Sequence, residues 1–283
     1  MIHPQAFVEE GAKVGQNVTI EPFAVVRSGV TLEKDVIVKS HAYIEGNTTI
    51  GEGTIIYPFA SIGTPSQNLK FRGETTFVKI GKHCQIRESV TINASSGEGT
   101  VVEVGDFCFI MAYCHIAHNC IIGNRVVMSN NATLAGHVTV EDHAIIGGMT
   151  PVHQFVRIGA YAMVGGLSRV PYDIPPYTLG AGIPFKFGGL NLIGLKRNGF
   201  NLETRSALSK CFKLLYRSKL HVEEAVLQMQ QQVEPLAEVA HFINFCKDSK
   251  RGLMGLQGVA SGMDGEIAED LQLEETSELA ATP

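Results

Sequence analysis

The sequence of 283 residues contains no tryptophan, no Cys-x-x-Cys pair and no run of about 18 apolar residues. The missing run argues against a membrane-spanning helix, and the start, Met1-Ile2-His3-Pro4, lacks the basic and apolar layout of a signal peptide. We therefore expect a cytoplasmic protein without stable membrane insertion. Six cysteines without a paired motif predict neither a disulfide framework nor a zinc motif in a chain of this length, and we expect them to be reduced.

Basic residues are also missing from the end of the chain, because none follows Arg251. The acidic residues of this tail are Asp264, Glu266, Glu269, Asp270, Glu274, Glu275 and Glu278. The 23 basic residues of the chain then face 28 minus 7, or 21, acidic ones. This balance argues against general nucleic-acid binding, which needs a concentrated basic surface. We expect residues 253–283 to form a disordered acidic tail.

What the sequence does contain is an aliphatic residue at every sixth position from Ile2 to Val170, at 26 of 29 positions. The three exceptions, Asn68, Glu74 and Glu98, fall where the sequence turns polar. They predict loops near residues 63–79 and 93–103. A period of six fits neither an amphipathic α-helix nor an ordinary hairpin sheet, and it predicts a helical coil of short strands.

A second column, four residues after each aliphatic, holds small side chains and predicts a narrow interior. Cys108, Cys114 and Cys120 belong to this column, so we interpret them as core residues rather than metal ligands. Glycine directly follows several of the aliphatics, as at Gly51 and Gly105. We expect these glycines to adopt unusual backbone angles at the corners of the coil.

The repeat resembles that of the hexapeptide-repeat transferases. The resemblance implies a triangular coil with left-handed winding and 18 residues per turn, so that residues 18 apart stack about 4.8 Å apart. On this geometry His118, Gly136 and Gln154 share a column, with His137 and His153 beside it. We interpret this group as a site, because perturbed titratable residues cluster at functional sites.

Other residues are assigned by the same geometry. His115 and Asn119 flank His118 in one coil, whereas His41, His83 and His143 stand singly, and we interpret those three as caps of the coil edges. A neutral imidazole at His118 is suited to take a proton from a sugar hydroxyl that attacks a thioester. The Gly136 N–H is suited to stabilise the developing oxyanion.

Longer motifs resemble the UDP-N-acetylglucosamine O-acyltransferase family over roughly residues 1–252. They are His115-Ile116-Ala117-His118, Asn130 to His137 (NNATLAGH), Gly147 to Gln154 (GGMTPVHQ), Ile86 to Ile92 (IRESVTI), Gly194 to Arg197 (GLKR) and Leu214 to Ser218 (LLYRS). The resemblance implies transfer of a fatty acyl group from acyl carrier protein to the glucosamine 3-hydroxyl of UDP-N-acetylglucosamine, the first step of lipid A biosynthesis. It also implies a homotrimer with sites between subunits, and no metal or cofactor besides the phosphopantetheine thioester of the donor.

The resemblance assigns a role to each candidate site residue. His118 is the general base and Gly136 the oxyanion donor; Gln67, Asn68, Lys70, His115, His137, His153, Gln154, Asn191 and Arg197 bind substrate; Met163 and Gly166 meet the acyl chain. Many family members carry aspartate where this chain has Asn68 and Asn119, and glutamate is common at the position of Ile193. Amides at the first two positions still hydrogen-bond but supply no charge.

The complete prediction is an all-β left-handed parallel β-helix of hexapeptide repeats over residues 1–180, followed by a small α-helical C-terminal domain over residues 181–252. The proline-rich stretch 171–184 ends the coil, and helical patterns follow near 201–217, 221–233 and 236–248. Basic residues gather around this cap, and they favour electrostatic steering of an acidic carrier protein: Lys196, Arg197, Lys210, Lys213, Arg217 and Lys219.

Three other classes of protein fit the sequence less well. A related N-acyltransferase carries an extra N-terminal uridine-binding domain, whereas the repeats here begin at residue 2. A zinc hydratase of the carbonic-anhydrase type shares the coil, but its His-x-x-x-x-His spacing is missing. A purely structural β-helix leaves the grouped histidines and polar loops unexplained. The acyl length, the need for a donor 3-hydroxyl and the choice between UDP-N-acetylglucosamine and an amino analogue stay open.

Overall fold

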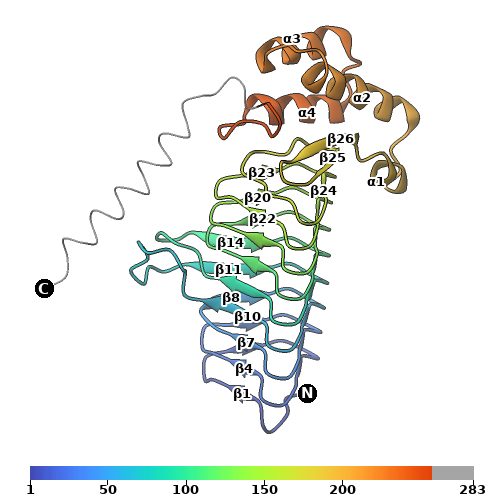
Figure 1. Ribbon diagram of the computed structural model, residues 1–283. Helices are drawn as coiled ribbons and strands as arrows, with labels where there is room; N and C mark the ends of the chain where they lie inside the picture. Colours follow the sequence, from blue (N-terminus) through green and yellow to red (C-terminus); the bar gives the residue numbers. More distant parts are fainter. Residues whose placement is uncertain (257–283) are drawn as a thin grey trace, which may run out of the picture.

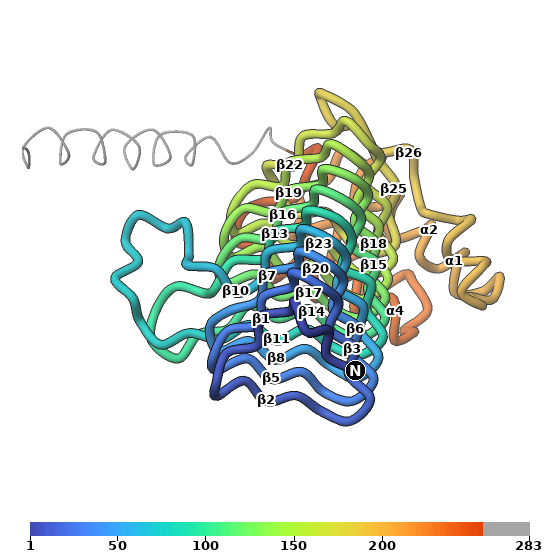
Figure 2. The backbone as a smooth tube through the Cα atoms, turned by 90° about the horizontal axis from the view of Figure 1, so that it is seen from below, coloured from blue at the N-terminus to red at the C-terminus, as the bar shows by residue number. Residues whose placement is uncertain are grey.

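The computed structural model describes residues 1–256, which form a tapering coil with a helical cap at its C-terminal end (Figure 1). Three parallel sheets make the sides of the coil, which is triangular when viewed along its axis (Figure 2). Sheet 1 contains, in order, β1 (Phe7–Val8), β4 (Val25–Val26), β7 (Tyr43–Ile44), β10 (Ser61–Thr64), β13 (Thr91–Asn93), β16 (His115–Ile116), β19 (Thr133–Leu134) and β22 (Pro151–Val152).

The other two sides follow the same pattern. Sheet 2 contains β2 (Lys13–Val14), β5 (Thr31–Leu32), β8 (Asn47–Ile50), β11 (Phe77–Ile80), β14 (Val101–Val104), β17 (Ile121–Ile122), β20 (Thr139–Val140) and β23 (Arg157–Ile158). Sheet 3 contains β3 (Thr19–Ile20), β6 (Ile37–Val38), β9 (Ile55–Ile56), β12 (Gln85–Ile86), β15 (Phe109–Ile110), β18 (Val127–Met128), β21 (Ile145–Ile146), β24 (Met163–Val164), β25 (Thr178–Ala181) and β26 (Lys186–Leu190).

Two loops leave the coil between sheet 1 and sheet 2. Loop 1 joins β10 to β11 and loop 2 joins β13 to β14, and both project from the same edge (Figure 2). In sheet 2, Thr31 pairs with Thr49 at the usual spacing of 18, whereas Ile50 pairs with Ile80 at a spacing of 30. The extra 12 residues are two whole hexads, which is why the six-residue register of the sequence survives the loop.

The interior confirms the two columns read from the sequence. The aliphatic column is buried from Ile20 to Val170, and the small column, including the cysteines at 84, 108, 114 and 120, is equally buried. All six cysteines are free and buried, as predicted for core residues. Because neighbouring coils present identical positions, each aliphatic side chain packs on the one below it, and about 25 cal/mol per Å² of apolar area favours this burial.

The prediction for the corner glycines holds at Gly63, whose φ is +80°, but is wrong in its mechanism at Gly51 and Gly105. Gly51 and Gly105 do not have a positive φ; the positive φ falls two residues later, on Gly53 and on the non-glycine Phe107. The glycine is needed for a different reason. A Cβ at Gly51 would lie 2.6 Å from the backbone of Gly81 in the next coil, so only glycine permits this approach.

The helical cap contains α1 (Leu192–Arg197), α2 (Leu202–Tyr216), α3 (Val222–Gln232) and α4 (Ala237–Lys247). The last three lie where the sequence predicted helices, within one or two residues at each end. Their buried faces form a second core around Leu208, Phe242 and Phe245. The short α1 was not predicted. Sheet 3 also continues past the proline-rich stretch, since β25 pairs parallel with β24 and β26 turns back against β25.

The predicted acidic tail lies outside the described residues beyond Leu256. Its first residues belong to the folded part instead: Leu253 and Met254 are buried, and Leu253 forms a bridge with Asp173 of the coil. In residues 1–256, no helix has the length and apolar character needed to cross a membrane. The fold observed here, a parallel β-helix of hexapeptide repeats followed by a small helical domain, is the predicted class.

Candidate active site

The grouped histidines lie on the edge between sheets 1 and 2. Both loops leave the coil from this same edge, in earlier coils. We call residues 117–119, 135–137 and 153–155 the site edge. The register of sheet 1 aligns His115 with Thr133, which confirms the 18-residue stacking of this region. His137 N–H donates to the His118 carbonyl at 3.0 Å, and Phe155 N–H donates to the Gly136 carbonyl at 3.1 Å. Three successive coils are thereby aligned.

The His118 ring is fixed by its neighbour. Its Nδ1 lies 2.8 Å from Asn119 Oδ1, and the amide of Asn119 is itself oriented by Ser96. Asn119 Nδ2 donates to the Ser96 carbonyl at 3.0 Å, while Asn119 Oδ1 accepts from the Ser96 N–H at 3.2 Å. The oxygen of the amide therefore faces His118, which requires the proton on Nδ1 and leaves Nε2 with its lone pair.

Ser96 also connects the site edge to loop 1. Asn68 Nδ2 donates to Ser96 Oγ at 3.2 Å, so Asn68 and Asn119 both meet loop 2 at one serine. Gln67 and Lys70 are the other candidates in loop 1, and the side chains of both are exposed. Loop 1 is held against loop 2 rather than standing alone.

Gly136 lies directly against the His118 ring. A Cβ at this position would lie 2.3 Å from His118 Cε1 and 2.5 Å from Nε2. The missing side chain allows the imidazole to approach the backbone of the next coil. Within residues 1–256, the Gly136 N–H has no hydrogen-bond acceptor, so it is available to a ligand beside Nε2.

Two further histidines surround this pair and are held neutral. His115 Nδ1 lies 2.8 Å from Thr91 Oγ1, and the His137 ring meets the His118 ring edge-on with centroids 5.2 Å apart. Burial lowers the pKa of His115 and of His137, and the neighbouring His118 lowers each further. Neutral imidazoles next to His118 avoid the repulsion that a cluster of cations would produce.

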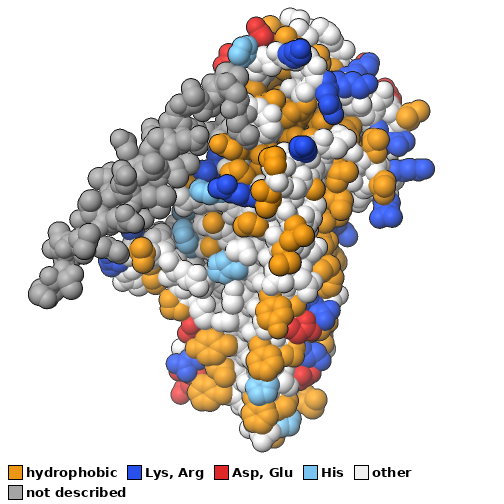
Figure 3. Space-filling model, in the orientation of Figure 1, with side chains coloured by type: hydrophobic (Ala, Val, Ile, Leu, Met, Phe, Trp, Pro, Cys, Tyr) orange, Lys and Arg blue, Asp and Glu red, His pale blue; other side chains and the backbone are white. Residues whose placement is uncertain are grey.

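His153 and Gln154 complete the site edge one coil above Gly136. His153 is partly buried, and Gln154 is exposed. Burial, followed by the charges of Arg251 and Arg169, lowers the pKa of His153, while the Gln154 carbonyl raises it. Figure 3 shows histidine side chains on the coil below the cap, with Lys and Arg side chains beside them.

Four other candidates lie away from both the site edge and the loops. Met163 belongs to β24 in sheet 3, and Gly166 lies at the next corner, between sheets 3 and 1. Asn191 and Arg197 begin and end α1, which lies on the side of the molecule away from the loops (Figures 1 and 2). In a single chain these residues are separated from His118 by the width of the coil.

The amide of Asn191 already has partners. Its Oδ1 accepts from Gly194 N–H at 3.0 Å as the cap of α1, and its Nδ2 donates to the Tyr161 carbonyl at 3.0 Å. The side chain is 6% exposed, so its first role is to attach α1 to the coil. Arg197 is exposed at the end of this helix.

The single histidines occupy other edges, as expected for caps. His41 stacks between Phe23 and Phe59, with ring centroids 5.1 Å from each. His83 stacks on Phe107, and His143 stacks on Tyr161. Across the described residues, no group of three or more His, Cys, Asp or Glu side chains has the arrangement to hold a metal ion.

The coil and the histidine edge define a hexapeptide-repeat transferase. A family model described as bacterial transferase hexapeptide (six repeats) matches residues 11–46 and 102–136. A second, described as UDP N-acetylglucosamine O-acyltransferase, domain 2, matches residues 173–254, which include α1 to α4.

Similar proteins and solved structures narrow the assignment of this chain to one family. Acyl-[acyl-carrier-protein]--UDP-N-acetylglucosamine O-acyltransferases from Chlamydia abortus and Chlamydia caviae are 56% and 51% identical, over 89% and 98% of this chain and 91% and 98% of theirs. The solved UDP-N-acetylglucosamine acyltransferase from Bacteroides fragilis has a TM-score of 0.87 at 34% identity, and that from Campylobacter jejuni has 0.84 at 38%. These alignments cover 89% and 90% of this chain and 99% of each structure.

The chain belongs to the UDP-N-acetylglucosamine O-acyltransferase family. The likeness to the solved structures confirms the predicted fold class, and the family and the enzyme class, an acyltransferase, are confirmed as well.

Sequence reasoning missed two contributors to the site. Ser96 lies in loop 2, outside the repeat, so its position could not be calculated from the register. Thr91 lies in the repeat, 24 residues before His115, because loop 2 adds six residues to the usual 18. Counting the loop as one whole hexad would have placed Thr91 beside His115.

Proposed function

We propose that this protein transfers a fatty acyl group from acyl carrier protein to the 3-hydroxyl of UDP-N-acetylglucosamine, the first step of lipid A biosynthesis, with His118 as the general base. The observation that carries the proposal is the orientation of His118. Asn119 fixes Nδ1, and Nε2 faces the backbone of Gly136, whose N–H is available. A base and an oxyanion donor thus lie side by side.

The reaction follows from this pair. His118 Nε2 takes the proton of the sugar hydroxyl as its oxygen attacks the thioester carbonyl carbon. The carbonyl oxygen becomes an oxyanion, which accepts a hydrogen bond from the Gly136 N–H. When the intermediate collapses, the carbon–sulfur bond breaks and the imidazolium returns its proton to the leaving thiolate. The phosphopantetheine arm is part of the donor substrate, so the chain needs no resident cofactor for these steps.

The remaining candidates support a site shared between subunits. His118 lies on one edge, whereas Met163, Gly166 and Arg197 lie on other sides of the coil. A cyclic homotrimer would place one edge of each chain against a different side of its neighbour. In this assembly Arg197 of one subunit meets the nucleotide from the end of α1, which Asn191 attaches to the coil, and Met163 and Gly166 meet the acyl chain, while His115, His137, His153 and Gln154 line the cleft.

The basic helical cap supports the carrier protein as a partner. Figure 3 shows Lys and Arg side chains gathered on the cap. Lys213 and Arg217 line a groove of about 300 Å³ beside β26. A field of this sign accelerates the encounter with an acidic protein and is weakened by salt. A cytoplasmic location, where both substrates would be met, stays a prediction.

The test uses purified protein, UDP-N-acetylglucosamine and a panel of acyl carrier protein thioesters, with mass spectrometry of the acylated nucleotide sugar. Wild type should form product, and His118→Ala should reduce kcat at least about 100-fold through loss of the base. His83→Ala, which removes a histidine stacked on Phe107 at another edge, is the matched control and should retain activity. Equal loss in both variants, or full activity of His118→Ala, would contradict the assigned base.

A further inference from the structure

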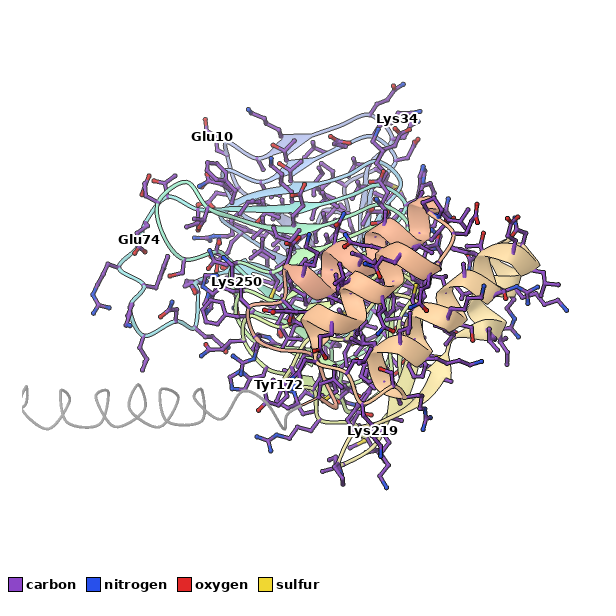
Figure 4. The ribbon with its side chains drawn as sticks, turned by 90° about the horizontal axis from the view of Figure 1, so that it is seen from above. Glu10, Lys34, Glu74, Tyr172, Lys219 and Lys250 are labelled. Carbon is purple, nitrogen blue, oxygen red and sulfur yellow. The ribbon has the colours of Figure 1, made fainter. Side chains whose placement is uncertain are left out.

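A group of basic side chains without an assigned role lies at the upper end of the site edge. Arg169 precedes Val170, whose carbonyl accepts the His153 N–H at 2.9 Å. Arg251 Nε donates to the carbonyl of Pro171, at 2.6 Å, in the coil directly above His153. Both charges are near enough to lower the pKa of His153. Lys250 lies on the side of the molecule where the loop carrying Glu74 projects (Figure 4).

The segment carrying Arg251 is clamped to the coil. Asp173 N–H donates to the Gly252 carbonyl at 3.0 Å, and Met254 N–H donates to the Asp173 carbonyl at 2.9 Å. Ser249 Oγ adds a hydrogen bond to Asp173 Oδ2 at 2.8 Å. The helical domain therefore delivers Arg251 to the coil in a fixed position, and little conformational freedom remains for a ligand to remove.

The charge of this group is not neutralised locally. Within residues 1–256, none of Arg169, Lys250 and Arg251 has an acidic oxygen within ion-pair distance. Asp173 acts electrostatically on Arg251 without forming an ion pair with it, and its two carboxylate oxygens accept the Arg157 backbone N–H and the Ser249 hydroxyl. Burial lowers the pKa of Arg251, so its guanidinium is partly dehydrated. A partly dehydrated, unpaired guanidinium favours an anionic ligand.

There is room for such a ligand beside the group. Arg169 borders a cavity of about 330 Å³ together with Pro171, Tyr172, Phe185 and Met254. The planar guanidinium of Arg251 uses only Nε in its bond to Pro171, and its two terminal nitrogens remain suited to a pair of phosphate oxygens.

We infer that Arg251 and Arg169 form a phosphate-binding subsite directly above His153. This inference rests on the proposed function, since both proposed substrates carry phosphate: the phosphodiester of the phosphopantetheine arm and the diphosphate of UDP. The shared chemistry is a phosphate bound by two guanidinium groups. The subsite orients its substrate toward the site edge, where the two cations also act to lower the pKa of His153.

Calorimetric binding without turnover tests the subsite. The probes are phosphopantetheine against pantetheine and UDP against uridine, so each pair differs only in phosphate. Wild type should prefer the phosphorylated member of at least one pair by about tenfold or more, the worth of a charge-assisted hydrogen bond. Arg251→Met and Arg169→Met should each lose most of this preference. Lys13→Met, which removes an exposed charge from the first coil, should keep it.

The outcomes separate the sources and the proposals. If the Arg variants lose the preference for phosphate only in the pantetheine pair, the subsite binds the phosphopantetheine arm of the carrier protein. If they lose it only in the uridine pair, the subsite binds the diphosphate of UDP. An unchanged preference in both folded variants, or a wild type without preference in either pair, overturns the subsite. Arg251→Lys keeps the charge while removing the paired geometry, and Arg169 is exposed, so a folding defect in Arg251→Met leaves two variants for the test. Because no acyl transfer is measured, absence of transferase activity fails the proposed function alone.

Discussion

At the scale of single residues, Gly136 limits what the site tolerates. The Cβ of Gly136→Ala would lie 2.3 Å from His118 Cε1, so the imidazole must move away from the N–H. We expect kcat/KM to fall at least about 100-fold, because small misplacements of a catalytic group have effects of this size. Steady-state kinetics measure the fall in kcat/KM, and thermal unfolding measures any loss of stability separately.

A matched glycine provides the control. A Cβ at Gly188 meets its nearest neighbour only at 3.9 Å, an ordinary contact, and Gly188→Ala should leave the unfolding temperature nearly unchanged. If Gly136→Ala retained full activity, the close approach of ring and backbone would have no catalytic meaning.

Asn119 sets the electrostatics of the same imidazole. Asn119→Asp places a carboxylate 2.8 Å from His118 Nδ1 and favours the protonated ring. The acidic limb of the pH–activity profile should therefore shift to higher pH. The variant also loses the donor to the Ser96 carbonyl and opposes two acceptors there, at about 1–3 kcal/mol in the free energy of unfolding. An unshifted profile would show that the amide serves only to hold loop 2.

The same residues show which parts of the site could be predicted from the sequence. His118, Gly136 and Gln154 were placed together because each lies in the repeat, where spacing translates directly into position. The position of Ser96 could not be predicted from the sequence, because a loop outside the repeat follows no period. Asn191 matched a motif, but a motif does not reveal that both ends of an amide are engaged by Gly194 and Tyr161.

At the scale of elements, the clamp between coil and cap depends on Asp173. Burial raises the pKa of this carboxyl, so its ionised form is the less favourable one in the folded state. The free energy of unfolding should then fall as pH rises from the unfolded-state pKa, about 3.9, through the folded-state value, and this component should be absent from Asp173→Asn. Denaturant unfolding of both proteins at several pH values measures the difference.

Asp173→Ala distinguishes charge from hydrogen bonding. Asparagine can still accept from the Arg157 N–H, whereas alanine leaves that buried donor unpaired at a cost of about 1–3 kcal/mol. Equal stability of the two variants at every pH would exclude a role for the side-chain hydrogen bonds of Asp173 to Arg157 and Ser249.

Elements were predictable to different degrees for physical reasons. The three long helices of the cap show a helical apolar period, and their ends were predicted closely. The six residues of α1 span too few turns to show one. The extension of sheet 3 through β25 and β26 was hidden by proline, which signals the end of a strand but does not prevent a new one from joining the same sheet.

At the scale of the whole molecule, a shared site predicts complementation between inactive chains. His118→Ala and Arg197→Met alter different sides of the coil, and each alone should be inactive as a homotrimer. In a cyclic trimer formed randomly from equal amounts of both chains, about one quarter of the sites combine an intact His118 with an intact Arg197. Co-expression followed by kinetics and mass determination measures this recovery. No recovery in mixed trimers would place both residues in one subunit's site.

The two ends of the coil are unlike. The cap closes the C-terminal end, whereas in residues 1–256 β1 and β2 have no strand below them and β3 pairs only with Met1 to His3; Ile2 and Val14 of this first coil are 48% and 37% exposed. In a stack where each turn contacts only its neighbours, opening begins at the unsupported end and spreads one turn at a time. The histidines lie many turns from that end, next to the cap. The first turns of the coil can therefore open while the site edge remains assembled.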